Sequence, residues 1–235
     1  MKKKIKVSII ILTWDLIHMT TNCVYSLLKI LKDYDWEIIF VDNQSTDGTQ
    51  EWLRFLENKY PNVKVLINNQ NLGYAASINR GLKIATGKYI WLLNNDTIVN
   101  ETSLNGLIKP MEEDEKLGIV ASCTNFVGNP LQSMLSPSEI KNLVIQCSEV
   151  HFVSVLLRKK MVDEIGLLDS EYISGFEDSD YTYLAKKNGW KVAVSMLSFV
   201  YHFGSQTIKE KLDFKKVWKL GEERFKMKWG NKEAI

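Results

Sequence analysis

Short apolar runs alternate with amphipathic stretches through the first half of the chain. The runs are nearly continuous and rich in β-branched residues, which is typical of strands buried on both faces. Between them, apolar residues recur at helical spacing, which predicts helices with one buried face. Pro110 is expected to kink the last of these helices or to end it early. We expect strands at residues 5–13, 36–41, 63–67, 89–93 and 118–122, and helices at 20–32, 49–59, 74–85 and 104–115.

This alternation predicts an α/β fold with a Rossmann-like, mostly parallel central sheet and helices on both faces. In such sheets, ligands bind beyond the carboxyl ends of the strands. Polar side chains are concentrated at those places, after each of the first four strands. They are Thr13, Trp14 and Asp15, then Asp42 and Asn43, then Asn71, and finally Asn94, Asn95 and Asp96.

The second half of the chain is less regular. Residues 124–146 are rich in Ser, Asn and Pro, and a strand at 152–157 and a short helix at 161–165 follow. Two short strands are expected at 192–194 and 199–201, directly before His202. From residue 207 the chain is predicted to be helical and basic, with an apolar stripe. We therefore divide the chain into a domain at 1–206 and a helical appendage at 207–235 that packs on the domain, on a second subunit or on a membrane surface.

Composition narrows the class of protein. The chain has 235 residues, of which 45% are hydrophobic, so a substantial core is expected. The formal net charge of +2 gives no indication of a nucleic-acid partner. Its three cysteines lack metal-site spacing, which favours a reducing compartment. The first apolar run is too short for a signal peptide, and no run is long enough to span a bilayer. We expect a cytoplasmic protein, with peripheral contact at the inner face of the membrane as an additional possibility.

The stretch GFEDSDYTYL, residues 175–184, carries three carboxylates within four residues. Ser179 or Asp180 is predicted to start a helix, because either side chain can accept hydrogen bonds from its first amides. Glu177 and Asp178 then lie on the loop before it, where a carboxylate facing a cleft can act as a general base. An acidic cap on a solvated helix end is the alternative.

Two common nucleotide-site signatures are absent from the sequence. It contains neither a GxGxxG motif nor a P-loop, so a dinucleotide site of that type is not predicted. A nucleotidyltransferase would carry a Gly-rich basic loop after the first strand, and TWDLIHMTTN is not such a loop. What remains is a set of oxygen and imidazole side chains, Asp96, Asp178 and His202, which are ligand types that suit Mg²⁺ or Mn²⁺.

Several motifs occur in the order found in glycosyltransferase family 2. They are VSIIILTW, VDNQSTDGT, NLGYAASINRGLKIATGKYIWLLNND, GLLDSEY with GFEDSDY, and HFGSQT. The chain resembles the bacterial rhamnosyltransferase-like members of this family over residues 4–206. The resemblance implies a GT-A fold, a nucleotide-sugar donor and inversion at the anomeric carbon.

The resemblance also implies donor-binding roles for particular residues. Asp42 is expected to bind the imide edge of uracil or thymine, with Thr13 and Asn71 holding the nucleoside. Asn79 and Arg80 are expected near the diphosphate or the donor sugar. Trp14, Asn94 and Asn95 complete the candidate donor site.

The same resemblance assigns the metal and the catalytic groups. Asp96, in the DXD-like NND motif, and His202 are expected to hold Mn²⁺ or Mg²⁺. Asp178 matches the catalytic base, and Glu177 is expected to position the acceptor or the loop. Many relatives have Asp in place of Asn94, so the neutral amide here removes one negative charge from the site.

We therefore expect an inverting glycosyltransferase that acts in surface polysaccharide synthesis. The expected donor is a UDP- or dTDP-sugar, with rhamnose as one candidate, and the expected acceptor is a hydroxyl of a glycan or a lipid-linked glycan. A homodimer is a further candidate assembly. The alternative is a catalytically silent nucleotide-sugar-binding or scaffold protein of the same fold.

Overall fold

The central sheet has nine strands in the part of the chain that the structure describes. The structure is a computed structural model, and it describes residues 6–125, 127, 129–133, 144–204 and 214–230. The strands are β1 (Lys6–Thr13), β2 (Asp35–Asp42), β3 (Val63–Ile67), β4 (Tyr89–Leu93), β5 (Thr97–Val99), β6 (Leu117–Thr124), β7 (Val144–Gln146), β8 (Ser154–Arg158) and β9 (Lys191–His202).

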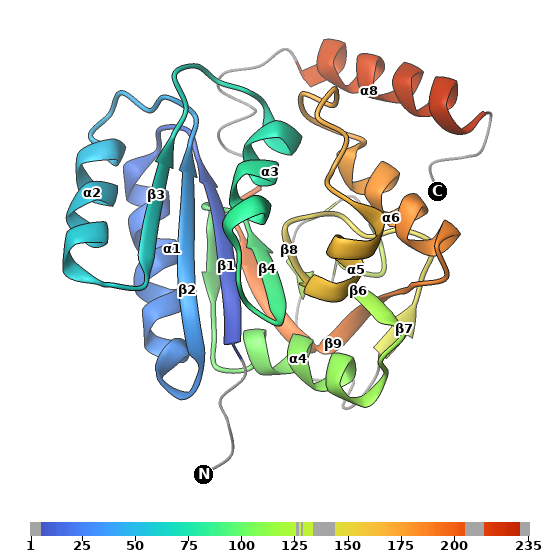
Figure 1. Cartoon of the computed structure of the whole chain (residues 1–235), viewed down its shortest axis with the longest axis horizontal. Helices are drawn as coiled ribbons and strands as arrows, with labels where there is room; N and C mark the ends of the chain where they lie inside the picture. Colours follow the sequence, from blue (N-terminus) through green and yellow to red (C-terminus); the bar gives the residue numbers. More distant parts are fainter. Residues whose placement is uncertain (1–5, 126, 128, 134–143, 205–213, 231–235) are drawn as a thin grey trace.

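Strand order along the sheet is β3-β2-β1-β4-β8-β6-β9-β5, and β7 also pairs with β9 (Figure 1). β1 is parallel to β2 and β4, β2 is parallel to β3, and β6 is parallel to β9. The parallel pairing predicted for the first half of the chain is thus confirmed, but the described sheet as a whole is mixed. β8 is antiparallel to both of its neighbours, β4 and β6, and β9 is antiparallel to β5 and β7. The start of β8 therefore lies at the edge of the sheet where the parallel strands end.

Helices cover both faces of the sheet, as predicted. Each strand buries alternate side chains in two separate cores, because successive side chains of a strand point to opposite faces. In β1, for example, Ile10 belongs to one core, whereas Ile9 and Ile11 belong to the other. Helices α3 (Tyr74–Ile84), α5 (Lys159–Ile165) and α6 (Glu177–Lys187) cover the first face, and α1 (Ile17–Ile30), α2 (Thr49–Lys59) and α4 (Ser103–Glu113) cover the second.

Some boundaries differ from the predicted ones. The two strands expected at 192–194 and 199–201 form one strand, β9, because the pairing with β6 jumps from Ser195 to Phe199 at a bulge. Such a bulge bends the strand without ending it. α1 begins at Ile17, earlier than expected, and the three-residue strands β5 and β7 were not expected. Residue 5 lies outside the described residues, as do residues 134–143 of the expected irregular segment.

α4 continues through Pro110 to Glu113, so of the two predicted alternatives, a kink and an early break, the early break is wrong. A proline at this position leaves the carbonyl of Gly106, four residues earlier, without its helical donor. The hydroxyl of Ser195 on β9 donates to that carbonyl over 2.7 Å. The side chain of a neighbouring strand thus replaces the missing amide hydrogen, which sequence periodicity along α4 does not show.

The helix at the C-terminal end, α8 (Phe214–Trp229), lies beside α6 (Figure 1). Phe225 of α8 is buried in the core beneath α6, with its ring 6.0 Å from that of Phe176. Packing on the domain is therefore observed for this helix. The expected division between residues 206 and 207 lies outside the described residues. None of the described helices has the length and apolarity needed to cross a bilayer.

Candidate active site

Asp42 ends β2 and is completely buried. Thr13, at the end of the neighbouring β1, donates its hydroxyl to Oδ2 of Asp42 over 2.8 Å. Ser45 donates its amide to Oδ1 over 2.9 Å and its hydroxyl to Oδ2 over 2.5 Å, and Gln50 donates to Oδ1 over 2.8 Å. The parallel register of β1 and β2, which pairs Thr13 with Asp42, brings these two predicted donor-site residues together.

Asp96 and His202 are in direct contact, although 105 positions separate them in the sequence. Nε2 of His202 lies 3.3 Å from Oδ1 of Asp96, and both side chains are almost fully buried. The amide of Phe203 donates to the carbonyl of Asp96, and β5 pairs Thr97 with His202. The two residues predicted to bind metal are therefore held side by side by main-chain pairing.

This pair fits a divalent cation such as Mn²⁺, which binds carboxylate oxygen and imidazole nitrogen. Among the described residues no cluster of three or more His, Cys, Asp or Glu side chains forms a metal site. Asp96 and His202 would accordingly supply part of a coordination sphere, to be completed by ligands from outside the described side chains. Mn²⁺ and Mg²⁺ commonly share such sites with phosphate oxygens.

The acidic motif lies at the start of α6, and the helix begins at Glu177. Gly175 and Phe176 have φ angles of +89° and +69°, so the chain turns sharply immediately before the helix. Glu177 and Asp178 thus occupy the first turn of α6, and the prediction that they lie on the preceding loop is wrong. Negative charge is favoured in a first turn because the amide dipoles point toward it.

Asp180 does not start the helix, so that prediction is wrong. The residue lies within the first turn, and its side chain is only 1% exposed. Oδ1 of Asp180 accepts a hydrogen bond from the indole Nε1 of Trp229 over 2.7 Å, and Lys228 lies 2.9 Å away. The carboxylate therefore joins α6 to α8 and caps no amide of its own helix.

Our sequence reasoning missed His151, which contacts the candidate base. Nδ1 of His151 lies 2.9 Å from Oδ2 of Asp178. The backbone of His151 is held by the side chain of Gln132, which accepts from its amide over 2.7 Å and donates to its carbonyl over 3.1 Å. Burial opposes protonation of His151, but the hydrogen bond and the charge of Asp178 outweigh it and raise the pKa of His151.

The sequence feature that could have identified His151 is its position just before a strand. In a parallel sheet the site lies where strands end, so residues before a strand lie at the opposite edge. β8 is antiparallel, and its register places Ser154 opposite Leu93. The amide of Asn94 donates to the carbonyl of Val153 over 2.9 Å. The segment that carries His151 thus lies directly beside the NND motif.

The carboxyl of Glu177 is buried without a full set of hydrogen-bond partners. Burial raises its pKa to about 8, and the negative charge of Asp178 contributes to the rise. No described residue donates a hydrogen bond to its Oε2 atom. At neutral pH the carboxyl of Glu177 is therefore largely protonated and can donate a hydrogen bond, whereas His151 holds the neighbouring Asp178.

Two further ionisable side chains surround this pair. The hydroxyl of Tyr74, at the start of α3, donates to the carbonyl of Phe152 over 3.3 Å. Burial raises the pKa of Tyr74, and the charges of Glu177 and Asp178 raise it further. Burial also raises the pKa of Glu149, which accepts a hydrogen bond from Ser179. The start of α6 is therefore a buried acidic centre with one imidazole partner.

Three other predicted donor residues have hydrogen-bond partners within the chain. Asn71 is exposed, and its side chain accepts from the amide of Gly73 over 2.8 Å. The amide group of Asn79 makes two hydrogen bonds with the main chain of Leu168, and Arg80 donates to Asn68 and to the carbonyl of Ile67. Asn79 and Arg80 thus make hydrogen bonds to neighbouring segments of the chain.

The remaining predicted donor residues differ in burial. Trp14 is half-buried. Asn95 is buried, and its side chain donates to the hydroxyl of Thr20 on α1 over 3.0 Å. Asn94 is half-buried, and its main-chain carbonyl accepts from the hydroxyl of Thr97 over 2.7 Å. Of the NND motif, Asp96 alone contacts His202 through the side-chain ion pair described above.

Comparison with curated proteins finds relatives among bacterial glycosyltransferases. The chain is 26% identical over 216 residues to the poly(ribitol-phosphate) β-glucosyltransferase of Bacillus spizizenii, covering 81% of this chain and 34% of that protein. It is 24% identical over 189 residues to the poly-β-1,6-N-acetyl-D-glucosamine synthase of Staphylococcus aureus, covering 73% of this chain and 44% of that protein. The chain therefore spans between a third and a half of the length of these relatives.

Two solved structures share the fold. The structure of GalNAc-T7 with UDP, GalNAc and Mn²⁺ superposes with a TM-score of 0.73 at 17% identity, over 86% of this chain and 44% of that chain. The structure of S. aureus TarS residues 1–349 has a TM-score of 0.66 at 23% identity, over 97% and 67%. The predicted GT-A fold is thus confirmed. The family model for glycosyl transferase family 2 matches residues 8–166, and the chain belongs to that family.

Proposed function

We propose that this chain is an inverting glycosyltransferase that moves a sugar from a nucleotide-sugar donor to a hydroxyl acceptor. The observation that carries the proposal is the contact between His151 and Asp178, 2.9 Å apart, at the sheet edge that also holds Asp96 and His202. A partly exposed carboxylate held by an imidazole is suited to accept a proton from a hydroxyl. Family membership supports the same class of reaction.

In this proposal each residue of the site has a separate role in the reaction. Asp178 accepts the proton of the acceptor hydroxyl, whose oxygen attacks the anomeric carbon on the side opposite the departing nucleoside diphosphate. His151 keeps Asp178 oriented, because Nδ1–H can donate to the carboxylate whether or not the ring is charged. Protonated Glu177 donates a hydrogen bond to the acceptor. Asp96 and His202 would hold a divalent ion, which supplies positive charge against the diphosphate.

Replacing Asp178 tests the base directly. The variant Asp178→Asn keeps the shape of the side chain but cannot accept the proton. General-base catalysis contributes roughly 10²- to 10⁴-fold, so kcat should fall by that factor while nucleotide affinity stays within about twofold. The measurement is the rate of nucleoside diphosphate release, with UDP or dTDP affinity followed by titration. A variant with the turnover of the native protein would show that Asp178 is not the base.

The donor is proposed to be a UDP- or dTDP-sugar bound by Asp42, Thr13 and Asn71, with Trp14, Asn79, Arg80, Asn94 and Asn95 completing the site. The burial of Asp42 beside Thr13 supports this placement. A thermal-shift panel of UDP-glucose, UDP-N-acetylglucosamine and dTDP-rhamnose with Mn²⁺ or Mg²⁺ identifies the donor, since ligands that bind only the native state raise its Tm. dTDP-rhamnose should give the largest shift if the protein is rhamnosyltransferase-like. No shift with any of the three would contradict the donor assignment.

The proposed setting is the synthesis of a surface polysaccharide on a glycan or lipid-linked acceptor. It is supported by the names of the relatives, which make a ribitol-phosphate polymer glycoside and a poly-N-acetylglucosamine. The rival hypothesis is a silent nucleotide-sugar-binding protein. Hydrolysis of the panel donors with Mn²⁺ separates the two, because a binding protein releases no nucleoside diphosphate. Asp96, His202 and Asp178 together favour the enzyme.

A further inference from the structure

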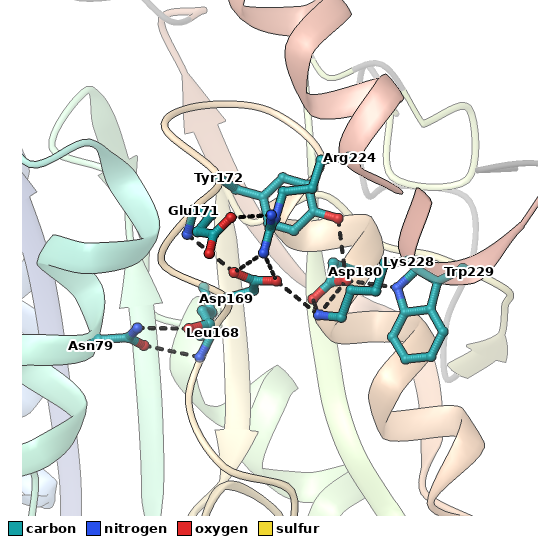
Figure 2. Close-up of polar contacts among 9 residues, drawn as sticks. All are labelled: Asn79, Leu168, Asp169, Glu171, Tyr172, Asp180, Arg224, Lys228 and Trp229. Carbon is teal, nitrogen blue, oxygen red and sulfur yellow. Dashed lines mark hydrogen bonds and ion pairs between the residues drawn. The ribbon is translucent and has the colours of Figure 1, made fainter. Parts of the chain in front are cut away.

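The loop that leads into the acidic motif is held from two sides (Figure 2). It comprises residues 166–176, between α5 and α6, and will be called the entry loop. On one side lies α3. The side-chain amide of Asn79 makes two hydrogen bonds with the main chain of Leu168, and the backbone amide of Tyr74 donates to the carbonyl of Ile173 over 2.8 Å. The other side of the entry loop meets α8. The loop from residue 167 onward and α8 lie beyond residues 8–166, the part that matches the family model.

Ionic contacts attach α8 to the entry loop. Nη2 of Arg224 donates to both carboxylate oxygens of Asp169, over 2.9 and 2.8 Å. Lys228 lies 3.0 Å from Oδ2 of the same carboxylate, and Arg224 also pairs with Glu171. Asp169 is largely buried, so it keeps these cations near it more strongly than a solvated carboxylate would.

A second set of contacts attaches α8 to the first turn of α6. The carboxylate of Asp180 is 1% exposed and is surrounded by donors. Nε1 of Trp229 donates to Oδ1 over 2.7 Å, Nζ of Lys228 donates to Oδ2 over 2.9 Å, and the hydroxyl of Tyr172 donates to Oδ1 over 3.3 Å. Asp180 lies two residues after Asp178 on the same helical turn, so a shift of one moves the other.

Apolar packing attaches α8 to the residues just before the helix. The ring of Phe176 lies 4.8 Å from that of Trp218 and 6.0 Å from that of Phe225. Gly221 lies so close that a Cβ atom on it would be 2.7 Å from the carbonyl oxygen of Gly175. Gly175 and Phe176 both have left-handed backbone conformations, which surrounding contacts must maintain. Three kinds of contact thus converge on residues 169–180.

We propose that α8 is a positioning clamp, which through Arg224, Lys228 and Trp229 holds the entry loop and the first turn of α6 so that Asp178 stays in its reactive place. The proposal rests on the function proposed above, because it takes Asp178 as the base. It assigns α8 a role in turnover, since the contacts described above join it to α6 and to the entry loop, which carry Asp178 and lead into it.

The test uses the full chain and compares variants of α8. The double variant Arg224→Gln with Lys228→Gln removes the ionic contacts, and Trp229→Phe removes the indole donor while keeping a ring beside Tyr183, which lies 4.6 Å from it. Arg224→Lys keeps the charge and tests rescue. The matched control is Lys219→Gln on the exposed face of α8, whose partner is Glu223 at 3.9 Å. Readouts are kcat for hydrolysis of the panel donors with Mn²⁺, UDP and dTDP affinity, and hydrogen exchange of residues 168–180.

Misplacing a catalytic group by about 1 Å can cost roughly 10²-fold in rate, so kcat should fall about 10- to 100-fold in the double variant and less in Trp229→Phe. Nucleotide affinity should stay within about twofold, exchange in residues 168–180 should accelerate, and Arg224→Lys and Lys219→Gln should stay near native turnover. Faster exchange with unchanged kcat in both clamp variants would overturn the proposal, as would equal losses of kcat and nucleotide affinity.

Asp178→Asn, assayed beside these variants, separates the two claims. Low turnover in Asp178→Asn with native turnover in the double variant would overturn the clamp and leave the proposed function intact. Native turnover in Asp178→Asn, or no nucleoside diphosphate release by the native protein, would overturn the proposed function and the clamp with it.

Discussion

Glu37 and Glu177 are both buried glutamates, and their neighbours give them opposite protonation at neutral pH. Burial alone would raise the pKa of Glu37, but hydrogen bonds from Lys64, Ser8 and Thr86 lower it to about 2. Burial and the charge of Asp178 raise the pKa of Glu177 to about 8. Glu37 lies where β1 and β2 begin, and Glu177 lies at the opposite, candidate active edge. The full set of hydrogen bonds around Glu37 identifies it as a structural residue. A buried carboxyl with an incomplete set, such as Glu177, is typical of a functional group.

The variant Glu177→Gln should change how stability depends on pH. Between pH about 4.5 and about 8 the folded protein holds a proton on Glu177 that the unfolded chain has released, so the native protein loses stability as pH rises through this range. Glutamine carries no charge, so the variant should gain roughly 5 °C in Tm over the native protein at pH 8 and nothing near pH 4. Thermal unfolding followed by circular dichroism at several pH values measures both.

His151 contributes in the same direction and remains in the variant. Its pKa is raised, so the stability it adds is full below its unfolded value of about 6.5 and is lost as pH rises through the folded value. Glu177→Gln should therefore flatten the pH dependence without abolishing it. Glu113→Gln, on an exposed position of α4, serves as control. A Tm difference that is the same at pH 4 and pH 8 would rule out the raised pKa of Glu177.

At the scale of single elements, the starts of α3 and α6 depend on each other through the entry loop. Gly73 precedes α3 with φ +78° and ψ −179°, a region that only glycine occupies readily. A Cβ atom at this position would lie 2.5 Å from the carbonyl oxygen of Ile173, which accepts the amide of Tyr74. The glycine of the NLGY motif therefore permits the entry loop to approach α3.

Gly73→Ala should destabilise the fold more than an alanine at an open left-handed position. Gly189 is the matched control, because its φ is +81° and nothing lies within 4 Å of its virtual Cβ. Gly189→Ala should cost about 1–2 kcal/mol from backbone strain, and Gly73→Ala about 1–3 kcal/mol more from the clash. Urea unfolding measures both free energies. Equal costs for the two variants would show that the contact with Ile173 gives way without strain.

At the scale of the whole molecule, α8 has one face on the domain and one in solvent. Phe225 is buried and the ring of Trp218 packs on Phe176, whereas Lys215, Lys216 and Lys219 are exposed. A basic outer face on an amphipathic helix is typical of peripheral contact with anionic lipid. Because the buried face is occupied by the domain, any such contact must use the lysine-bearing face.

A peripheral membrane contact predicts that the full chain floats with phosphatidylserine-containing vesicles and not with phosphatidylcholine vesicles. Each lysine near an anionic surface contributes about 1 kcal/mol, so reversing Lys215 and Lys219 to Glu should weaken binding at least about tenfold. The control is reversal of Lys109 and Lys116, which are exposed on another part of the surface. Flotation that is the same for all three proteins would remove the membrane role from α8.

Local sequence determined the elements and most of the candidate chemistry. The strands β1 to β4 and the helices between them follow from apolar periodicity, because each element buries its own apolar face. The motifs also singled out Asp42, Asp96, Asp178 and His202 before their contacts were known. These residues lie at strand ends, at a turn and at the start of a helix, where a polar side chain is not explained by apolar periodicity and therefore stands out in the sequence.

Only the tertiary structure decided which of these groups meet. The antiparallel direction of β8 brings His151 into contact with Asp178, and the register of β5 with β9 brings His202 into contact with Asp96. A serine hydroxyl of β9 allows α4 to continue through Pro110. Asp180 joins α6 to α8, because its buried carboxylate lies within reach of Lys228 and Trp229. Each of these outcomes depends on partners tens of residues away, and pairing over such separations is set by the packing of whole elements and not by local periodicity.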